Sequence, residues 1–281
     1  MSNSVQLFVG CASNGEDAES LVVLEYSLHK NTGSEAVQIH YMKQEPSASS
    51  IWSGWNTTQW ATPFSAFRWA VPAAAATDGH KKAIYCDSDF IFLSDLRRLW
   101  NQEFKPGKIA MVKGGTEGWR FCLTMWNVEE AMKIPEIRDV FANKADPYLH
   151  RNLNQLMVTK YADRLQTFDG DWNNTDGEQK PIAEIDALHY SSMCHQLHAS
   201  YALERLTRQG RKHWFDDEVL PHWRQDLQTL FDNYYRWALQ SGMKVEDFDP
   251  GCVLVPIVKE SQKGYSSRPA HSWVGATTNG K

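Results

Sequence analysis

The sequence predicts an α/β fold with a mixed, mostly parallel central sheet flanked by helices. Residues 5–11 and 37–42 have strand composition and enclose a helical pattern at residues 16–30, which gives a strand, helix, strand unit with parallel pairing. A continuous apolar run at residues 83–93 is typical of a strand that is covered on both faces. The pattern becomes helical after Ser200. We therefore expect one α/β domain over residues 1–200 and a helical extension with a tail over residues 201–281.

The composition favours a globular protein and gives no reason to expect a nucleic-acid partner. The chain has 281 residues, of which 42% are hydrophobic, so it can bury a substantial core in one large domain or two small ones. The formal net charge is -5, whereas binding a phosphate backbone relies on clustered Lys and Arg. We therefore expect partners other than DNA or RNA.

The cysteines and the N-terminus indicate a soluble, cytoplasmic protein. The cysteine number is odd, no Cys-x-x-Cys pair occurs, and the residues are widely spaced, as expected for reduced thiols. The first ten residues lack a basic leader, and no apolar run is long enough to span a membrane. A peripheral membrane contact stays open. The cysteines are Cys11, Cys86, Cys122, Cys194 and Cys252.

A loop with an unusual aromatic content follows the first strand, helix, strand unit. Residues 44–62 are rich in Ser, Pro and Gly and contain Trp52, Trp55 and Trp60. Tryptophan rings could form a platform for the apolar face of a sugar, or they could fasten the loop to the core, since Trp is usually largely buried. The sequence leaves both interpretations open.

The later elements follow from the same patterns. Residues 63–76 are helical in pattern, with Pro63 in the first turn and Pro72 at a kink or break. Apolar residues recur at helical spacing from Trp223 to Ala238. Further strands are expected at residues 108–113, 120–128 and 182–190, and further helices at residues 95–100, from 129 onward, 146–159 and 220–240.

Two acids interrupt the buried run at residues 83–93. Asp87 and Asp89 would lie where the strand ends, at the edge where α/β sheets bind ligands, and charged groups there carry a large desolvation cost. A hard cation such as Mg²⁺ or Mn²⁺ takes carboxylate and phosphate oxygens, so the pair is suited to hold a metal for a nucleotide diphosphate. Alternatively the acids only cap a solvated loop. The helix start at Asp95, directly after a short strand, favours the metal site.

Residues 67–100 also carry a family resemblance. In order they read Phe-Arg-Trp-Ala-Val-Pro, then Lys-Lys-Ala-Ile-Tyr-Cys-Asp-Ser-Asp-Phe-Ile-Phe, then Ser-Asp-Leu and Leu-Trp. This stretch resembles the family 8 glycosyltransferases, which are the glycogenin-like and bacterial lipopolysaccharide galactosyltransferase enzymes. The resemblance implies that residues 1–200 form a GT-A catalytic domain that binds a nucleotide sugar. It further implies a UDP-sugar donor, Mn²⁺ at the Asp-x-Asp, a saccharide or glycolipid acceptor, and transfer with retention.

The resemblance also implies residues that bind the donor. Arg68 would lie beside the donor sugar and the acid pair, and it could also be a structural partner of Asp87. Ser88, between the two acids, is a further donor-binding candidate. The family holds uracil and ribose at the end of the first strand, although its usual acid and tyrosine are missing here and an ordinary turn would explain the segment as well. The corresponding residues are Cys11, Ala12, Ser13 and Asn14.

The third metal ligand implied by the resemblance is His189. The family has a histidine at the end of its last strand, in a His-x-x-Gly-x-x-Lys-Pro-Trp pattern. The histidine matches here, whereas the glycine and the lysine do not. Without that lysine, His195 or Arg68 is expected to meet the diphosphate.

Two further candidates come from matching positions. The family has an acid and glutamine pattern on the sugar face, where a nucleophile or stabiliser has been sought, and this chain has His150 and Arg151 there. Either the alignment is shifted or the donor sugar is stabilised differently. Residues 168–174 resemble the family's Trp-Asn turn, in which Asp171 could bind sugar hydroxyls, although turn-forming residues explain most of this segment.

The chemistry expected is transfer of a glycosyl group to an acceptor hydroxyl. A metal at Asp87, Asp89 and His189 would stabilise the charge that grows on the leaving diphosphate. Two alternatives stay open. One is a phosphotransferase of the haloacid dehalogenase type, whose Asp-x-Asp also follows an apolar strand, although it usually opens the chain and has Thr or Val where this chain has Ile91. The other is a carbohydrate-binding protein without turnover.

Overall fold

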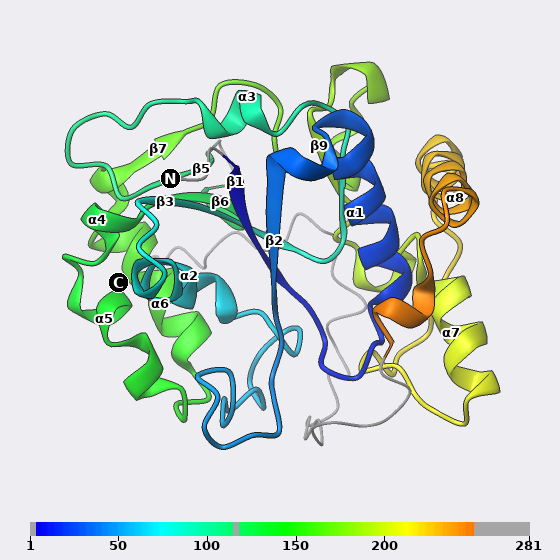
Figure 1. The fold of residues 1–281 in the computed structure, drawn as a ribbon, viewed down its shortest axis with the longest axis horizontal. Coiled ribbons are helices and arrows are strands. Elements are labelled where there is room, and N and C mark those ends of the chain that lie inside the picture. Colours follow the sequence, from blue (N-terminus) through cyan, green and yellow to red (C-terminus); the bar gives the residue numbers. More distant parts are fainter. Residues whose placement is uncertain (1–3, 115–117, 250–281) are drawn as a thin grey trace, which may run out of the picture.

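The computed structural model describes residues 4–114 and 118–249. The strands form a six-stranded sheet with the order β2-β1-β3-β6-β5-β7 and a three-stranded sheet with the order β4-β9-β8. The predicted α/β class, with a mixed and mostly parallel central sheet, is confirmed (Figure 1). The strands are β1 (Val5–Gly10), β2 (Val37–Met42), β3 (Lys82–Asp87), β4 (Phe90–Phe92), β5 (Ala110–Lys113), β6 (Arg120–Asn127), β7 (Leu165–Thr167), β8 (Asn174–Thr175) and β9 (Ala187–His189).

Helices lie on both sides of the large sheet. Figure 1 shows α1, α7 and α8 together on one side and α2, α4, α5 and α6 on the other. Side chains of β1 alternate between the two layers, as the period of a strand requires: Phe8 packs with the α2 side, whereas Leu7 and Val9 pack with α1. The helices are α1 (Ala18–Asn31), α2 (Phe67–Thr77), α3 (Arg97–Trp100), α4 (Val128–Ala131), α5 (Pro135–Arg138), α6 (Leu149–Thr159), α7 (Ala199–Arg208) and α8 (Gln225–Gln240).

The pairing of the strands brings the ends of β1 and β3 to the same edge of the sheet. β1 is parallel to β2 and to β3, and Gly10 lies opposite Asp87 in the register. β6 is antiparallel to both of its neighbours, β3 and β5. The β1-α1-β2 unit was predicted correctly, and every residue of β1 is buried.

The tryptophan loop is fastened to the core. Trp55 and Trp60 are buried, and their rings make edge contacts with Phe67 of α2, at centroid distances of 5.3 and 5.7 Å. Trp52 is partly buried and stacks on Trp55. Of the two interpretations left open by the sequence, the structure favours rings that fasten the loop to the core over a sugar platform.

Three predicted elements are wrong in extent. The helix expected at residues 63–76 begins only at Phe67, so Pro63 precedes it. The strand expected at residues 182–190 is a 3₁₀ turn at Ile182–Glu184, and only Ala187–His189 forms a strand, in the small sheet. Pro181 begins that turn with its φ already fixed. The helix expected from Leu220 starts at Gln225 because Pro221 disfavours the helical conformation of the residue before it. Pro72, in contrast, lies inside α2.

The described part of the predicted extension packs against the α/β layers. Leu227 and Phe231 of α8 share a buried cluster with Val23 of α1 and Leu188 of β9. None of the described helices combines the length and the apolar character that crossing a membrane requires. The predicted polar tail, residues 262–281, and Cys252 lie outside the described residues.

Candidate functional site

The acid pair lies on the link between the two sheets. Asp87 is the last residue of β3, and Phe90 is the first residue of β4, so Ser88 and Asp89 alone connect them. This is the carboxyl end of β1 and β3, as expected for a ligand site in an α/β sheet. Ser88 itself is buried.

Asp87 forms a buried ion pair with Arg68 of α2. One guanidinium nitrogen donates to both carboxylate oxygens at 3.0 Å, and the exposed fractions are 8% for Arg68 and 6% for Asp87. Arg68 also donates through Nε to the Ser65 carbonyl at 2.8 Å. Burial by itself lowers the pKa of Arg68, but the charge of Asp87 together with Cys122 and Tyr85 outweighs burial, and the pKa is raised. The structure therefore places Arg68 beside the acid pair.

The Tyr85 hydroxyl is a second donor to Asp87. Tyr85 lies two residues earlier on the same face of β3, and its hydroxyl donates to Asp87 Oδ1. Burial, with the Asp87 carboxylate adding to it, raises the pKa of Tyr85 well above its usual value, so the hydroxyl keeps its proton. The Asp87 carboxylate is thus held in one orientation by two side chains.

Asp89 faces His189 at the end of β9. The distance from His189 Nε2 to Asp89 Oδ1 is 3.3 Å, and the imidazole stacks on Phe90 with a centroid distance of 4.5 Å. Burial lowers the pKa of His189, but Asp89, with Asp87 and Asp176 adding to it, outweighs burial, and the pKa is raised. Among the described residues, Asp89 Oδ1 and His189 Nδ1 are buried without a hydrogen-bond partner.

The donor set at this point fits a divalent cation. One oxygen or nitrogen atom each from Asp87 and His189 lies within 4.8 Å of the other and of Cys122 Sγ. Carboxylate oxygens and an imidazole nitrogen are ligands that Mn²⁺ accepts. Asp89 Oδ1 lies in an ion pair with His189 Nε2, but neither it nor His189 Nδ1 makes a hydrogen bond to a described residue, and buried polar atoms without a hydrogen bond are costly. Burial raises the pKa of Cys122 to about 12, so its thiol keeps its proton.

His150 is held by α2. Trp69 Nε1 donates to His150 Nδ1 at 3.1 Å. Burial, with the charge of Arg68 adding to it, lowers the pKa of His150 to about 3, so the imidazole is neutral. The structure therefore places His150 on the Arg68 side of the site, with one ring nitrogen already used as an acceptor.

Asp171 is part of an ion network that joins the sheets. Its carboxylate lies 3.1 Å from Lys113 Nζ and 3.3 Å from Lys180 Nζ, and its carbonyl accepts from the backbone N–H of Asp186 and Ala187. These contacts account for Asp171 structurally. They leave its expected role with sugar hydroxyls a proposal.

His195 lies in a different environment from the acid pair. Its Nδ1 is 3.0 Å from Ser192 Oγ, and its ring meets Trp223 edge-on at 4.8 Å. Nearby is a pair that the sequence did not reveal: His222 Nε2 lies 3.1 Å from Asp176 Oδ2, and both side chains are fully buried. The expected contact of His195 with a diphosphate remains a proposal.

The turn after β1 is covered by its own acids and by a tryptophan. The Asn14 N–H donates to Glu16 at 3.1 Å, and the Ala12 N–H donates to Asp17 Oδ2 at 2.7 Å. Trp214 Nε1 donates to the other oxygen of Asp17 at 3.1 Å. All four expected donor-binding residues of this turn are buried in the structure, namely Cys11, Ala12, Ser13 and Asn14.

Comparison with known proteins identifies the fold. No known protein family and no curated protein matches the sequence. Among solved structures, the apo form of the glycosyltransferase GlyE from Streptococcus pneumoniae TIGR4 is 13% identical, with a TM-score of 0.54 over 88% of this chain and 63% of that chain. The apo structure of the bifunctional glycosyltransferase WbbM is 10% identical, with a TM-score of 0.50 over 73% of this chain and 50% of that chain.

The chain has the GT-A fold. The structural neighbours are glycosyltransferases of the family 8 type, so the fold implied by the resemblance at residues 67–100 is confirmed. This chain spans half the length of WbbM and less than two thirds of GlyE. A shared fold does not by itself establish an activity, which depends on this chain's own residues.

Proposed function

We propose that the chain is a metal-dependent glycosyltransferase that moves a sugar from a UDP-sugar to a hydroxyl of a saccharide or glycolipid acceptor. The observation that carries this proposal is that His189 lies close to Asp87 and to Asp89 at the carboxyl end of β3 in a GT-A fold. These residues would hold Mn²⁺ or Mg²⁺. A bound ion would supply Lewis-acid stabilisation of the charge that develops on the leaving diphosphate.

The hydrogen bonds to Asp87 leave one of its carboxylate oxygens able to bind such an ion. Arg68 and Tyr85 both donate to Oδ1, whereas Oδ2 accepts only from Arg68 among the described side chains. A carboxylate oxygen can accept two hydrogen bonds or ligate a cation with its second lone pair. Arg68 and Tyr85 therefore orient Asp87 without using up Oδ2, and the positive charge of Arg68 is available beside the site for a phosphate.

Retention is proposed from the family resemblance at residues 67–100, and neither Asp171 nor His150 offers a free nucleophile for a covalent intermediate. Asp171 is engaged by Lys113 and Lys180, and His150 is a neutral acceptor for Trp69. With neither group free to attack the anomeric carbon, retention would require the acceptor hydroxyl to attack from the face that the diphosphate leaves. No covalent intermediate is then required.

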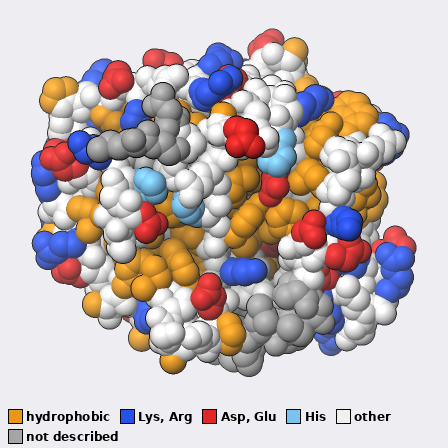
Figure 2. All heavy atoms as spheres, in the orientation of Figure 1, with side chains coloured by type: hydrophobic (Ala, Val, Ile, Leu, Met, Phe, Trp, Pro, Cys, Tyr) orange, Lys and Arg blue, Asp and Glu red, His pale blue; other side chains and the backbone are white. Residues whose placement is uncertain are grey.

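Surface charge and thiols agree with a small-molecule donor and a reducing compartment. On the face shown in Figure 2, Lys and Arg side chains are scattered among Asp and Glu rather than gathered into one basic patch. A dispersed pattern gives little attraction for a nucleic-acid backbone. Cys11, Cys86 and Cys122 are free thiols, which agrees with the cytoplasmic location proposed from the sequence.

Calorimetric titration of UDP, with and without Mn²⁺, tests the proposal. We expect Mn²⁺-dependent binding by the wild type, loss of binding in Asp89→Asn, and unchanged binding in Asp226→Asn, a matched change of an exposed carboxylate at the start of α8. Asparagine keeps the shape of the side chain and removes its charge. Binding that is indifferent to metal and to Asp89 would contradict the metal site.

The nucleotide and the reaction class are tested separately. If GDP or ADP binds with the same dependence and UDP does not, the metal site stands and the uridine assignment is wrong. Metal-dependent hydrolysis of UDP-sugars without acceptor would support a transferase over a carbohydrate-binding protein. Hydrolysis of a simple phosphomonoester, lost in Asp87→Asn, would instead support the phosphotransferase alternative.

A further inference from the structure

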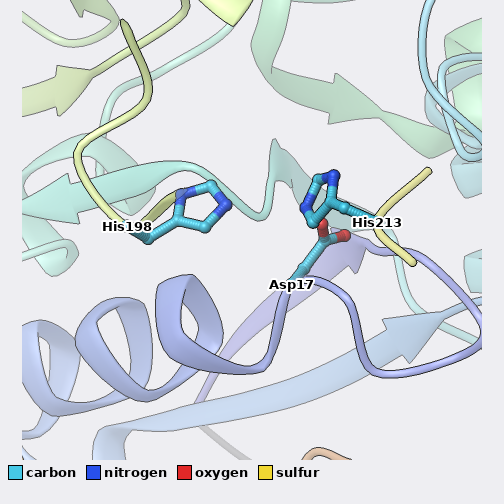
Figure 3. Close-up of side chains that lie close together, drawn as sticks. All are labelled: Asp17, His198 and His213. Carbon is cyan, nitrogen blue, oxygen red and sulfur yellow. The ribbon is translucent and has the colours of Figure 1, made fainter. Parts of the chain in front are cut away.

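A second cluster of metal-binding side chains lies beside the turn that follows β1. Asp17 precedes α1, His198 precedes α7, and His213 lies in the segment between α7 and α8 (Figure 3). One ligand atom from each of the three residues lies within 4.8 Å of the others. Asp17 and His198 are both 2% exposed. None of these residues belongs to the Asp87, Asp89 and His189 site.

His198 is the most informative member of this cluster. Both of its ring nitrogens are buried, and neither has a hydrogen-bond partner among the described residues. Its other neighbours include the rings of Tyr190 and Phe231, at centroid distances of 5.9 and 6.5 Å. A buried polar atom without a partner costs about 1–3 kcal/mol, so two such atoms on one ring call for a ligand. Figure 3 shows an edge of this ring turned toward Asp17 and His213.

The Asp17 carboxylate is oriented but not neutralised by its hydrogen bonds. The Ala12 N–H and the Trp214 indole N–H each donate to one of its oxygens, at 2.7 and 3.1 Å. Both donors are uncharged, and each oxygen retains a second lone pair. Ligating carboxylates in metal sites are held by hydrogen bonds of this kind. Asp17 is therefore prepared to face a cation.

We propose that Asp17, His198 and His213 bind a divalent transition-metal ion, with zinc as the best fit. Two imidazoles and one carboxylate are a common ligand set for Zn²⁺, whereas Mg²⁺ and Ca²⁺ prefer oxygen ligands throughout. Bonds of about 2.0–2.2 Å in a tetrahedral site place the ligand atoms about 3.4 Å apart, so small side-chain rotations suffice to close the present arrangement.

The ion would fasten the segment after β9 to the β1-α1 turn. Its ligands come from the start of α1, from the start of α7 and from the segment that carries Trp214, which lie far apart in the sequence. A metal bound only by the folded chain stabilises it by mass action. The role proposed is structural, and it is independent of the glycosyltransferase proposal.

Cobalt binding tests the site directly, because Co²⁺ in an imidazole and carboxylate site has visible absorption bands. Protein without a histidine tag is stripped with EDTA and titrated with Co²⁺ in excess Mg²⁺, which competes for the acid pair. We expect the wild type to bind one equivalent of Co²⁺ tightly. In His198→Gln the affinity should fall by more than the factor of about 10 to 100 that loss of a mere supporting hydrogen bond costs.

Two controls separate this site from others. His29→Gln changes a partly exposed histidine of α1, and Asp89→Asn changes the acid pair. Both variants should keep the Co²⁺ spectrum and affinity. Absence of saturable Co²⁺ binding, equal binding by His198→Gln, or loss in Asp89→Asn alone would each overturn the proposal.

A further variant keeps the test decisive if His198→Gln fails to fold. Trp214→Phe keeps an aromatic ring and removes only the indole donor to Asp17, so we expect Co²⁺ affinity to fall by about 10- to 100-fold. Zn²⁺ should raise the thermal unfolding temperature of the wild type and raise that of Trp214→Phe less at the same concentration. Equal Co²⁺ affinities and equal Zn²⁺ shifts would refute the assignment.

Discussion

The ion pair between Arg68 and Asp87 should make a large and non-additive contribution to stability. Replacing Arg68 with Met leaves a buried carboxylate with the Tyr85 hydroxyl as its remaining side-chain donor, and Asp87→Asn leaves a buried guanidinium without its counter-ion. Both partners are less than a tenth exposed. Removing one partner of a buried pair costs about 3–5 kcal/mol, because the other charge stays desolvated. We expect each single variant to lose stability in this range.

The double variant distinguishes the pair from ordinary packing. With both charges removed, no uncompensated charge remains, so Arg68→Met with Asp87→Asn should cost less than the sum of the single variants by about 2–3 kcal/mol. Urea unfolding followed by circular dichroism gives each free energy from its midpoint. Arg97→Met, which removes an exposed partner of Asp95, is the matched control and should leave the midpoint nearly unchanged.

Additivity would refute this reasoning. If the two single costs sum to the cost of the double variant within about 0.5 kcal/mol, the charges do not stabilise one another. If each single variant costs less than about 1 kcal/mol, the pair has the weak energetics of surface ions despite its burial.

Three further predictions follow from other contacts. His150 is neutral in the folded state, where its pKa is about 3, whereas in the unfolded state its imidazole takes up a proton near pH 6.5. The contribution of His150 to stability should therefore be complete above about pH 6.5 and fall by about 1–2 kcal/mol at pH 5. Urea unfolding at the two pH values should show that this loss is absent in His150→Phe. Trp55→Ala should lower the free energy of unfolding by about 3–5 kcal/mol, measured by thermal unfolding, because the ring is buried where the loop packs on the core. UDP binding per folded molecule should be unchanged. Gly10→Ala would place a Cβ 2.6 Å from the Tyr85 hydroxyl, which must then move away from Asp87. Calorimetry should show weaker Mn²⁺ binding by Gly10→Ala than by the wild type. In a Tyr85→Phe background, Gly10→Ala should cause no further weakening.

The sequence predicts best those parts of the fold that local pattern determines. The apolar runs at β1 and β3 and the alternation of strand, helix and strand fixed both the class and the early element bounds. An apolar run does not reveal the direction of a strand, and so the antiparallel placement of β6 between β3 and β5 was not foreseen. The division into two sheets depends on the pairing of β4 with β9, which are distant in the sequence.

The same distinction holds for the candidate site. Asp87 and Asp89 stand out because two acids break one buried strand, whereas His189 was found only through a family resemblance. The Asp176–His222 pair and the group of Asp17, His198 and His213 carry no local signature. In the sequence each of these residues looks like an ordinary polar residue, because only tertiary packing buries it beside its partner.

The pairing of Phe90 with His189 has a consequence for the order of folding. Asp87 and Asp89 are close in the sequence, whereas His189 reaches them only after the chain has passed through β5, β6, α6, β7 and β8. Closing so long a segment is entropically costly, and contacts of this kind slow folding and form late. A nascent or partly refolded chain would therefore hold the acids but not the complete ligand set. Tight Mn²⁺ binding would report that the small sheet has assembled, which makes the metal a kinetic probe of the last folding step.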